Sequence, residues 1–170
     1  HRARLEYLHM GSNRIGGSGA KLLAESLPAC QSLSYMDLSN NRVGAEGVKA
    51  LASSLPLCMH LAHLQLSLNS LGDDGIGFLA STLPSCETLR DLDVGGNEIS
   101  SEGAAKLASA LELSPGIRRL ALRNNEVGSQ GAGLIAEALK GNPTLKYLDL
   151  SQNRIGPEGA GRVAEAVREL

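Results

Sequence analysis

The sequence has few aromatic side chains with which to build a core: it contains no Trp, one Phe and three Tyr among 170 residues. Aliphatic side chains must therefore fill the interior almost alone. An excess of one charge is also lacking, because 16 Lys and Arg stand against 18 Asp and Glu. This balance excludes a nucleic-acid binder that relies on bulk positive charge. No apolar run approaches the ~20 residues that a membrane-spanning helix needs.

What the sequence has instead is a strict internal repeat. An asparagine recurs every 28 residues. The asparagines are Asn13, Asn41, Asn69, Asn97, Asn125 and Asn153. The segments around them, such as residues 61–69 and 145–153, follow the pattern Leu-x-x-Leu-x-Leu-x-x-Asn, with Met36 in place of the second Leu in residues 33–41. Six copies in one register cover essentially the whole chain, so residues 1–170 are predicted to form a single repeat domain.

Each repeat predicts one strand followed by one helix. Apolar and polar residues alternate at positions 36–38, as expected of a strand with one buried face. Further along, the second repeat has an apolar stripe at helical spacing, formed by Val48, Leu51, Ala52 and Leu55. A proline follows this stripe in three repeats and is predicted to stop the helix. These prolines are Pro28, Pro56 and Pro84.

One strand and one helix cannot bury their apolar faces alone, so neighbouring repeats must stack. We therefore expect an α/β solenoid of six 28-residue repeats, curved like a horseshoe. Its parallel sheet would lie on the concave side and its helices on the convex side.

Two further columns of residues recur at the same spacing and are predicted to be structural. The asparagine amide is expected to bond backbone groups of the turn that follows the strand. A glycine near each helix start is expected to let the helix approach the loop beneath it. The glycines are Gly19, Gly47, Gly75, Gly103, Gly131 and Gly159.

The repeat pattern resembles the leucine-rich repeat. Its length and the Gly-x-Glu-Gly sequence at residues 44–47 and 156–159 are similar to the ribonuclease-inhibitor subclass. This subclass includes ribonuclease inhibitor, the Ran GTPase-activating proteins, and the C-terminal sensor regions of the NOD-like receptors and the class II transactivator. The Leu-Pro-x-Cys turns look most like the last group. The resemblance implies an intracellular protein, in the cytoplasm or the nucleus, that senses ligands or serves as a scaffold by binding other proteins.

The apolar pattern continues into both terminal repeats without a polar capping unit. Leu5, Leu8 and Met10 show it in the first repeat, and Val167 and Leu170 in the last. We therefore expect a fragment of a longer protein, or end-to-end contacts with another chain.

The residues between the framework leucines are expected to face the concave groove, in columns that run across the strands. One column collects all three tyrosines of the chain, a residue type enriched in binding hot spots. It consists of Tyr7, Tyr35, His63, Asp91, Arg119 and Tyr147. The next column consists of His9, Asp37, Gln65, Asp93, Ala121 and Asp149.

Flanking positions add basic side chains and one exposed leucine, Leu68, where other repeats carry Ser, Asn, Gly or Gln. Asp91 and Arg119 are neighbours and could simply pair with each other, and the other charges could be a solvated surface. The leading interpretation is a groove that binds a partner protein. Its predicted contact residues are Tyr7, Tyr35, His63, Leu68, Asp91, Asp93, Arg118, Arg119, Arg123, Tyr147 and Asp149.

The sequence predicts no cofactor, no metal site and no enzymatic activity. Cys30, Cys58 and Cys86 share one repeat position and are expected to be reduced, buried thiols. Cys58 should point inward and His63 toward the groove, so they cannot hold one zinc ion together with His60. The glycines of residues 16–19 lack the spacing of a phosphate-binding loop.

The alternative function is that of a Ran-GTPase-activating-type regulator. That family supplies an arginine from an irregular loop between repeats and carries a long acidic tail. Arg14, Arg42 and Arg154 follow the asparagines and could reach a nucleotide. However, the repeat spacing never breaks, and residues 163–170 are not an acidic run.

Overall fold

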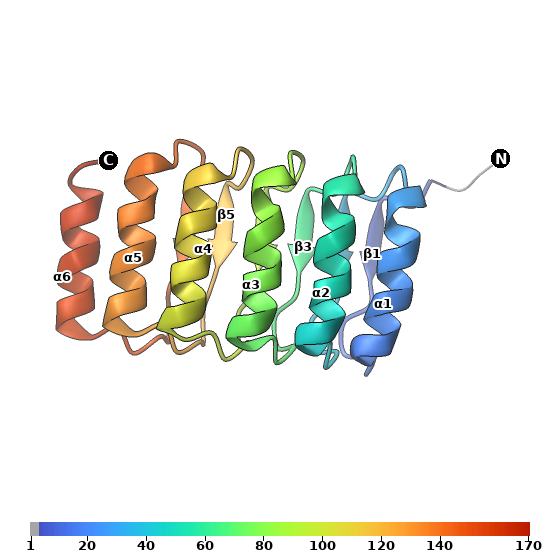
Figure 1. The fold of residues 1–170 in the computed structure, drawn as a ribbon, viewed down its shortest axis with the longest axis horizontal. Helices are drawn as coiled ribbons and strands as arrows, with labels where there is room; N and C mark the ends of the chain where they lie inside the picture. The colour runs from blue at the N-terminus through green and yellow to red at the C-terminus, as the bar shows by residue number, and fades with distance from the viewer. Residues whose placement is uncertain (1–3) are drawn as a thin grey trace.

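The computed structural model describes residues 4–170 as six strand–helix repeats in a single row (Figure 1). The strands pair in parallel, each with its neighbours in sequence, in the order β1-β2-β3-β4-β5-β6. They are β1 (Tyr7–His9), β2 (Tyr35–Asp37), β3 (His63–Gln65), β4 (Asp91–Asp93), β5 (Arg119–Ala121) and β6 (Tyr147–Asp149). Each repeat therefore contacts mainly the repeats before and after it, as in a solenoid.

One helix follows each strand and packs beside the helices of the adjacent repeats. The helices are α1 (Gly16–Ser26), α2 (Gly44–Ser54), α3 (Gly72–Thr82), α4 (Ser101–Leu113), α5 (Gly128–Gly141) and α6 (Gly156–Val167). Three short 3-10 turns follow the first three helices. These are η1 (Leu27–Ala29), η2 (Leu55–Leu57) and η3 (Leu83–Ser85).

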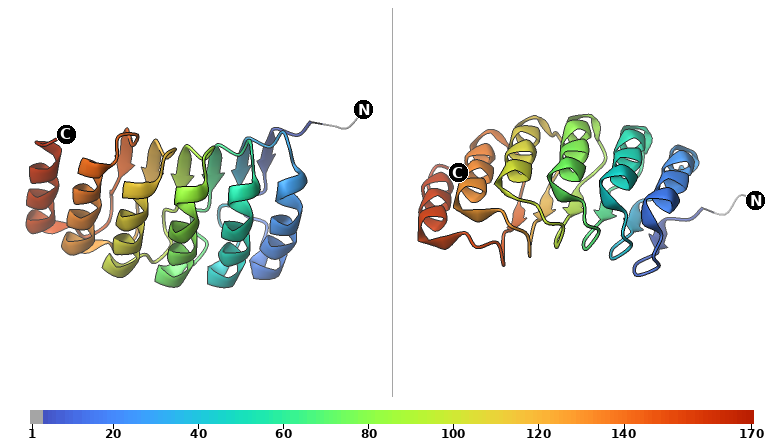
Figure 2. Two further views of the ribbon diagram at one scale, coloured as in Figure 1. Left: turned by 45° about the horizontal axis from the view of Figure 1, so that its top comes forward. Right: turned by 60° about the horizontal axis from the view of Figure 1, so that its bottom comes forward.

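All the helices lie on one side of the sheet, and within residues 4–170 no element covers its other side (Figure 2). Packed helices are about 8–10 Å apart, whereas paired strands are only about 4.8 Å apart. Stacked repeats must therefore curve with the sheet on the inner side, and we call the uncovered side of the sheet the concave face. The predicted α/β solenoid of parallel strands and outer helices is confirmed.

The first three α-helices end just before a proline, but helical structure does not stop there as predicted. Pro28, Pro56 and Pro84 lie inside the 3-10 turns, so the chain continues for one tight turn beyond each α-helix. Proline is tolerated there because the first residues of a helical turn need no intrahelical donor. After α4 and α5 the next prolines, Pro115 and Pro143, come three positions later in the repeat, and these helices extend to 13 and 14 residues instead of 11.

The core lies between the sheet and the helices and is almost entirely aliphatic. The central residue of each inner strand and the framework residue two positions later are completely buried, as in Met36 with Leu38 and Leu64 with Leu66. The corresponding residues of the last repeat, Leu148 and Leu150, are only partly buried. Stacking on both sides is thus what removes these side chains from water, as expected if one repeat cannot form a core alone.

The asparagine column forms a hydrogen-bonded ladder that joins consecutive repeats. The Asn69 side-chain nitrogen donates to the carbonyl oxygens of Leu66, in its own turn, and of Leu38, in the preceding repeat, at 3.0 and 2.9 Å. Its side-chain oxygen accepts from the backbone N–H groups of Asn41 and Val43 at 3.0 and 3.1 Å. The structural role predicted for these asparagines is confirmed, and each one from Asn41 onward also bonds the turn of the preceding repeat.

The glycine column is explained by two contacts, one with the loop residue that precedes the same helix, as predicted, and one with the neighbouring helix, which was not predicted. A Cβ atom on Gly47 would lie 2.8 Å from the side chain of Val43, in that loop. It would also lie 2.9 Å from the Cα atom of Gly17, in the preceding helix. One on Gly159 would lie 2.8 Å from the Cα atom of Ser129, also in the preceding helix. The first turns of neighbouring helices touch through their backbones, and this spacing requires a residue without a side chain.

The three cysteines are free but not equally buried. Cys86 is buried, and this burial raises the pKa of its thiol to about 11. Cys58 is partly exposed and Cys30 is exposed, so the expectation of three buried thiols was wrong for these two. The longer α4 packs against η3, next to Cys86, whereas α2 ends before it can do the same for η1.

Candidate functional site

The structure places the predicted tyrosine column on the concave face as a continuous row. Parallel pairing aligns Tyr7 with Tyr35, Tyr35 with His63, His63 with Asp91, Asp91 with Arg119 and Arg119 with Tyr147. Successive side chains of a strand point to opposite faces, so a buried central residue sends its two neighbours to the uncovered side. Tyr7 and Tyr147 are 61% and 47% exposed, and Tyr35 is partly buried between its neighbours.

The first three strands bring together four rings, Tyr7, His9, Tyr35 and His63, which we call the aromatic cluster. The ring centre of Tyr35 lies 4.7 Å from that of His9, 6.2 Å from that of Tyr7 and 6.1 Å from that of His63. The rings are tilted by 35–39°, within the range of favourable aromatic pairs. Burial, and then the carboxylates of Asp37, Asp91 and Asp93, raise the pKa of Tyr35 above its ordinary value.

The last three strands carry a charged cluster, which we define as Asp91, Arg119, Arg123, Tyr147 and Asp149. Arg119 lies 3.5 Å from the carboxylate of Asp91, and its guanidinium stands over the Tyr147 ring at 4.4 Å from the ring centre. Hydrogen bonds from the Ser151 hydroxyl and backbone lower the pKa of Asp149, and Arg123 and Arg119 act in the same direction. Asp91 also lies 3.4 Å from His63, which joins this cluster to the aromatic one.

Asp93 is not available to a partner as predicted, because it is only 6% exposed. One carboxylate oxygen accepts a hydrogen bond from the backbone of Gly95 at 2.9 Å, and the other lies 3.9 Å from Arg123. Arg123 lies over Gly95, where a Cβ atom would be 2.9 Å from its side chain. Other repeats have Ser or Gly at this position, and the basic residue in the fifth repeat is what covers Asp93 in the fourth.

Leu68 lies at the edge of the sheet, where the strands lead into the helices, and is 54% exposed. It adopts a left-handed backbone conformation with φ of 57° and packs against Gly96. Together with Arg123, Asn124 and Gln152 it lines a hollow of about 210 Å³. Arg118 is exposed at the opposite edge, where the strands begin, so Leu68 and Arg118 flank the tyrosine column from two sides.

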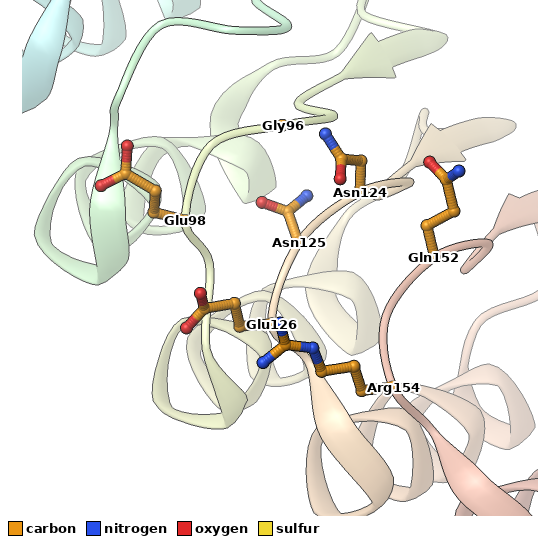
Figure 3. Close-up of a pocket in the computed structure, with 7 residues that line it drawn as sticks. All are labelled: Gly96, Glu98, Asn124, Asn125, Glu126, Gln152 and Arg154. Atoms are coloured by element: carbon orange, nitrogen blue, oxygen red, sulfur yellow. The ribbon is translucent and has the colours of Figure 1, made fainter.

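A second hollow, of about 270 Å³, adjoins the first one and was not predicted (Figure 3). It is lined by the strand-to-helix loops of three consecutive repeats through Gly96, Glu98, Asn124, Asn125, Glu126, Gln152 and Arg154. Left-handed residues occur in each of these loops, among them Asn124 and Gln152. The sequence signal was the set of polar residues beside the last three framework asparagines, namely Glu98, Asn124, Glu126, Gln152 and Arg154. Repeat comparison alone assigns these residues to solvent.

Among residues 4–170, no three His, Cys, Asp or Glu side chains are grouped so that they could hold a metal ion. None of the helices in this part of the chain combines the length and the apolar character needed to cross a membrane.

Comparison with known proteins identifies the repeat. A family model described as "Leucine Rich repeat" matches residues 4–24, 29–52, 57–80, 85–108 and 141–164. The part between 108 and 141 that it does not match contains β5 and most of α5, which have the same arrangement as the other repeats. No curated protein sequence matches the chain.

Two solved structures share the fold at low sequence identity. One is described as leiomodin-1 actin-binding site 2, with a TM-score of 0.75 at 18% identity over 86% of this chain and 86% of that one. The other is the tropomodulin C-terminal domain of Caenorhabditis elegans, with a TM-score of 0.69 at 22% identity over 88% of this chain and 92% of that one. At these identities the similarity shows a common fold and no more.

Proposed function

The chain belongs to the leucine-rich repeat family, and we propose that its concave face binds another protein. Parallel sheets are normally covered on both faces, but residues 4–170 cover only one face of this sheet. The observation that carries the proposal is that all three tyrosines of the chain lie in one column of the uncovered face. A protein that used the tyrosines only for packing would have no reason to collect them there.

The two clusters supply different parts of a binding surface. The aromatic cluster offers a large apolar area that loses little side-chain freedom on binding, with polar atoms at its rim. The charged cluster holds Arg119 between Asp91 and Tyr147, so that its remaining donors are already oriented. Such preorganisation lowers the entropy that binding would otherwise cost.

The proposal is tested by removing one ring from each cluster in the variant Tyr35→Ala/Tyr147→Ala. Each ring contributes about 1 kcal/mol to stability through its neighbours, well below the total stability of a domain, so the variant should fold. Immobilised protein is incubated with an extract of cells that contain it, and the captured proteins are quantified by mass spectrometry. We expect specific partners to be lost from the variant.

The matched control is Leu22→Ala/Leu134→Ala, which removes two exposed apolar side chains from helices on the other side of the molecule. It should capture the same partners as the unaltered protein. Equal capture by the tyrosine variant and by the unaltered protein, with circular dichroism showing both to be folded, would contradict the proposal.

Actin is the first individual partner to test. The solved structure with a TM-score of 0.75 is described as an actin-binding site of leiomodin-1. Cosedimentation with actin filaments, and native gels with monomeric actin, measure this directly. Binding by the unaltered protein that the tyrosine variant loses would assign actin to the concave face, and an absence of binding would remove actin from the proposal.

The two more specific functions suggested by the sequence, a NOD-like-receptor sensor region and a regulator of a small GTPase, have less support. A sensor region like that of the NOD-like receptors was proposed from the Leu-Pro-x-Cys turns, and the similarity to known proteins does not favour it. A regulator of a small GTPase would use Arg14, Arg42 or Arg154, all of which are exposed in regular loops. Single-turnover GTP hydrolysis by Ran, with and without this protein, tests that alternative.

A further inference from the structure

Three consecutive repeats carry a basic residue at the position immediately before the strand. These residues are Arg90, Arg118 and Lys146, which we call the basic row. The same position in the first three repeats holds Glu6, Ser34 and Ala62. The edge where the strands begin therefore changes from weakly acidic to strongly basic halfway along the solenoid.

The three residues of the basic row lie side by side because hydrogen bonds join their backbones. The N–H group of Arg118 donates to the carbonyl oxygen of Arg90 at 2.8 Å, and that of Lys146 donates to the carbonyl oxygen of Arg118 at 2.8 Å. Paired strands are about 4.8 Å apart, so the three side chains leave the sheet at this interval. Arg118 and Lys146 are exposed, and Arg90 is partly buried.

No carboxylate in residues 4–170 forms an ion pair with a member of the basic row, in contrast to the neighbouring Arg119 and Arg123. Arg90 instead donates to backbone carbonyl oxygens, those of Glu87 at 2.6 Å and of Leu89 at 3.3 Å. Its guanidinium packs against Gly116, where a side chain would displace it. Arg90 is thus fixed in place while its charge stays without a counter-charge.

We propose that the basic row binds an acidic segment of the partner protein. This inference rests on the proposed function, because it adds the partner's chemistry at the edge of the same concave face. The Cβ atoms of residues three or four apart on a helix are about 5–6 Å apart, so acidic side chains at these positions start at nearly the interval of the row. A nucleic-acid strand fits less well, because it carries a charge on every nucleotide and would need basic residues along more of the edge, where the first three repeats have Glu6, Ser34 and Ala62.

The test uses a fluorescent alanine-based peptide of about 20 residues, long enough to form a helix, with Glu at every fourth position. A second peptide has Gln in place of Glu, and a single-stranded oligonucleotide of similar length is the third probe. Binding is measured by fluorescence anisotropy. We expect the Glu peptide to bind and the Gln peptide not to bind. Raising the salt from about 0.1 M to about 1 M shortens the screening length from about 10 Å to about 3 Å and should abolish binding.

The variant Arg118→Gln/Lys146→Gln should weaken binding of the Glu peptide about tenfold, because two exposed charge pairs are lost. The matched control Lys21→Gln/Arg42→Gln removes one Lys and one Arg that are exposed elsewhere and should change binding less than twofold. The variant Tyr35→Ala/Tyr147→Ala separates the two proposals, since it should lose the protein partner and still bind the Glu peptide.

Three results would overturn the inference. Equal binding of the Glu and Gln peptides would show that charge is not recognised. Equal losses in the basic-row variant and in the control would show only a general effect of net charge. Tighter binding of the oligonucleotide than of the Glu peptide, lost in the basic-row variant, would assign the row to nucleic acid. The tyrosine-dependent capture of a protein could persist in each of these cases.

Discussion

The two halves of the concave face share one framework and differ in their surface chemistry. In the first three repeats the column between the framework leucines consists of Tyr7, Tyr35 and His63, and rings contact rings. In the last three it consists of Asp91, Arg119 and Tyr147, and charges contact charges or a ring. The buried leucines and the asparagine ladder are the same in both halves.

The fold accommodates either aromatic or charged side chains on the concave face, because these side chains contribute little to its stability. The buried positions supply the apolar area, and the asparagines satisfy the backbone of the turns. No side-chain nitrogen or oxygen that is fully buried within residues 4–170 lacks a hydrogen-bond partner. The surface columns are therefore free to be specialised for recognition, and the two halves can contact different parts of one partner.

The prediction with the largest expected effect tests whether the asparagine ladder contributes equally to stability in both halves. Asn69→Leu and Asn125→Leu should each lower the free energy of unfolding by about 3 kcal/mol, because buried carbonyl and N–H groups lose their partner. Asn13→Leu should cost less, because Asn13 is exposed and its side chain bonds only the carbonyl oxygens of Met10 and Gly11. Urea denaturation measures all three, and clearly unequal costs for Asn69 and Asn125 would break the comparison.

A prediction with a smaller expected effect tests whether ion pairs on the two halves of the concave face differ in strength. A double-mutant cycle of Asp91→Asn and Arg119→Gln should give a coupling energy of about 0.5 kcal/mol, as expected for a partly exposed ion pair. The matching cycle of His9→Gln and Asp37→Asn should give less at neutral pH, because those two groups are 3.9 Å apart. Thermal or urea unfolding at low and high salt provides the measurement. Equal coupling in both cycles would mean that the two halves do not differ in electrostatics.

The smallest effect concerns the acid stability of the second half. Hydrogen bonds from Ser151 lower the pKa of Asp149 below its ordinary value of 3.8. The contribution of this carboxylate to stability is therefore complete above pH 3.8 and is lost as the pH falls through the lowered pKa. The stability difference between the unaltered protein and Asp149→Asn should shrink as the pH is lowered from about 5 to about 2. A difference that does not change with pH would rule out this contribution.

Much of the fold could be predicted because the length of the sequence repeat is constant. The strands, the helices, the order of the sheet and the row of tyrosines all follow from the spacing of the asparagines and leucines. The interactions between neighbouring repeats could not be predicted in the same way. Asp93 is buried because Arg123 of the next repeat covers it, and Gly47 is needed because Gly17 of the preceding repeat touches it.

The candidate site was likewise predictable only in part. Repeat comparison found the tyrosine column, Leu68, the basic side chains and the possible pair of Asp91 with Arg119, which lie 3.5 Å apart in the structure. It did not find the contact of Arg123 with Asp93 or the stacking of Arg119 on the Tyr147 ring. The hollow beside Arg154 depends on three loops whose conformations are set by left-handed residues.

The sequence by itself determined the solenoid and the side of the sheet on which each variable residue lies, because a fixed repeat length converts position in the chain into position on a surface. Only the tertiary structure decided how much of each side chain is exposed, which charges are neutralised, and where helices touch through glycine. The physical reason is that these properties depend on distances of a few ångströms between side chains of different repeats, and the period carries no information about them.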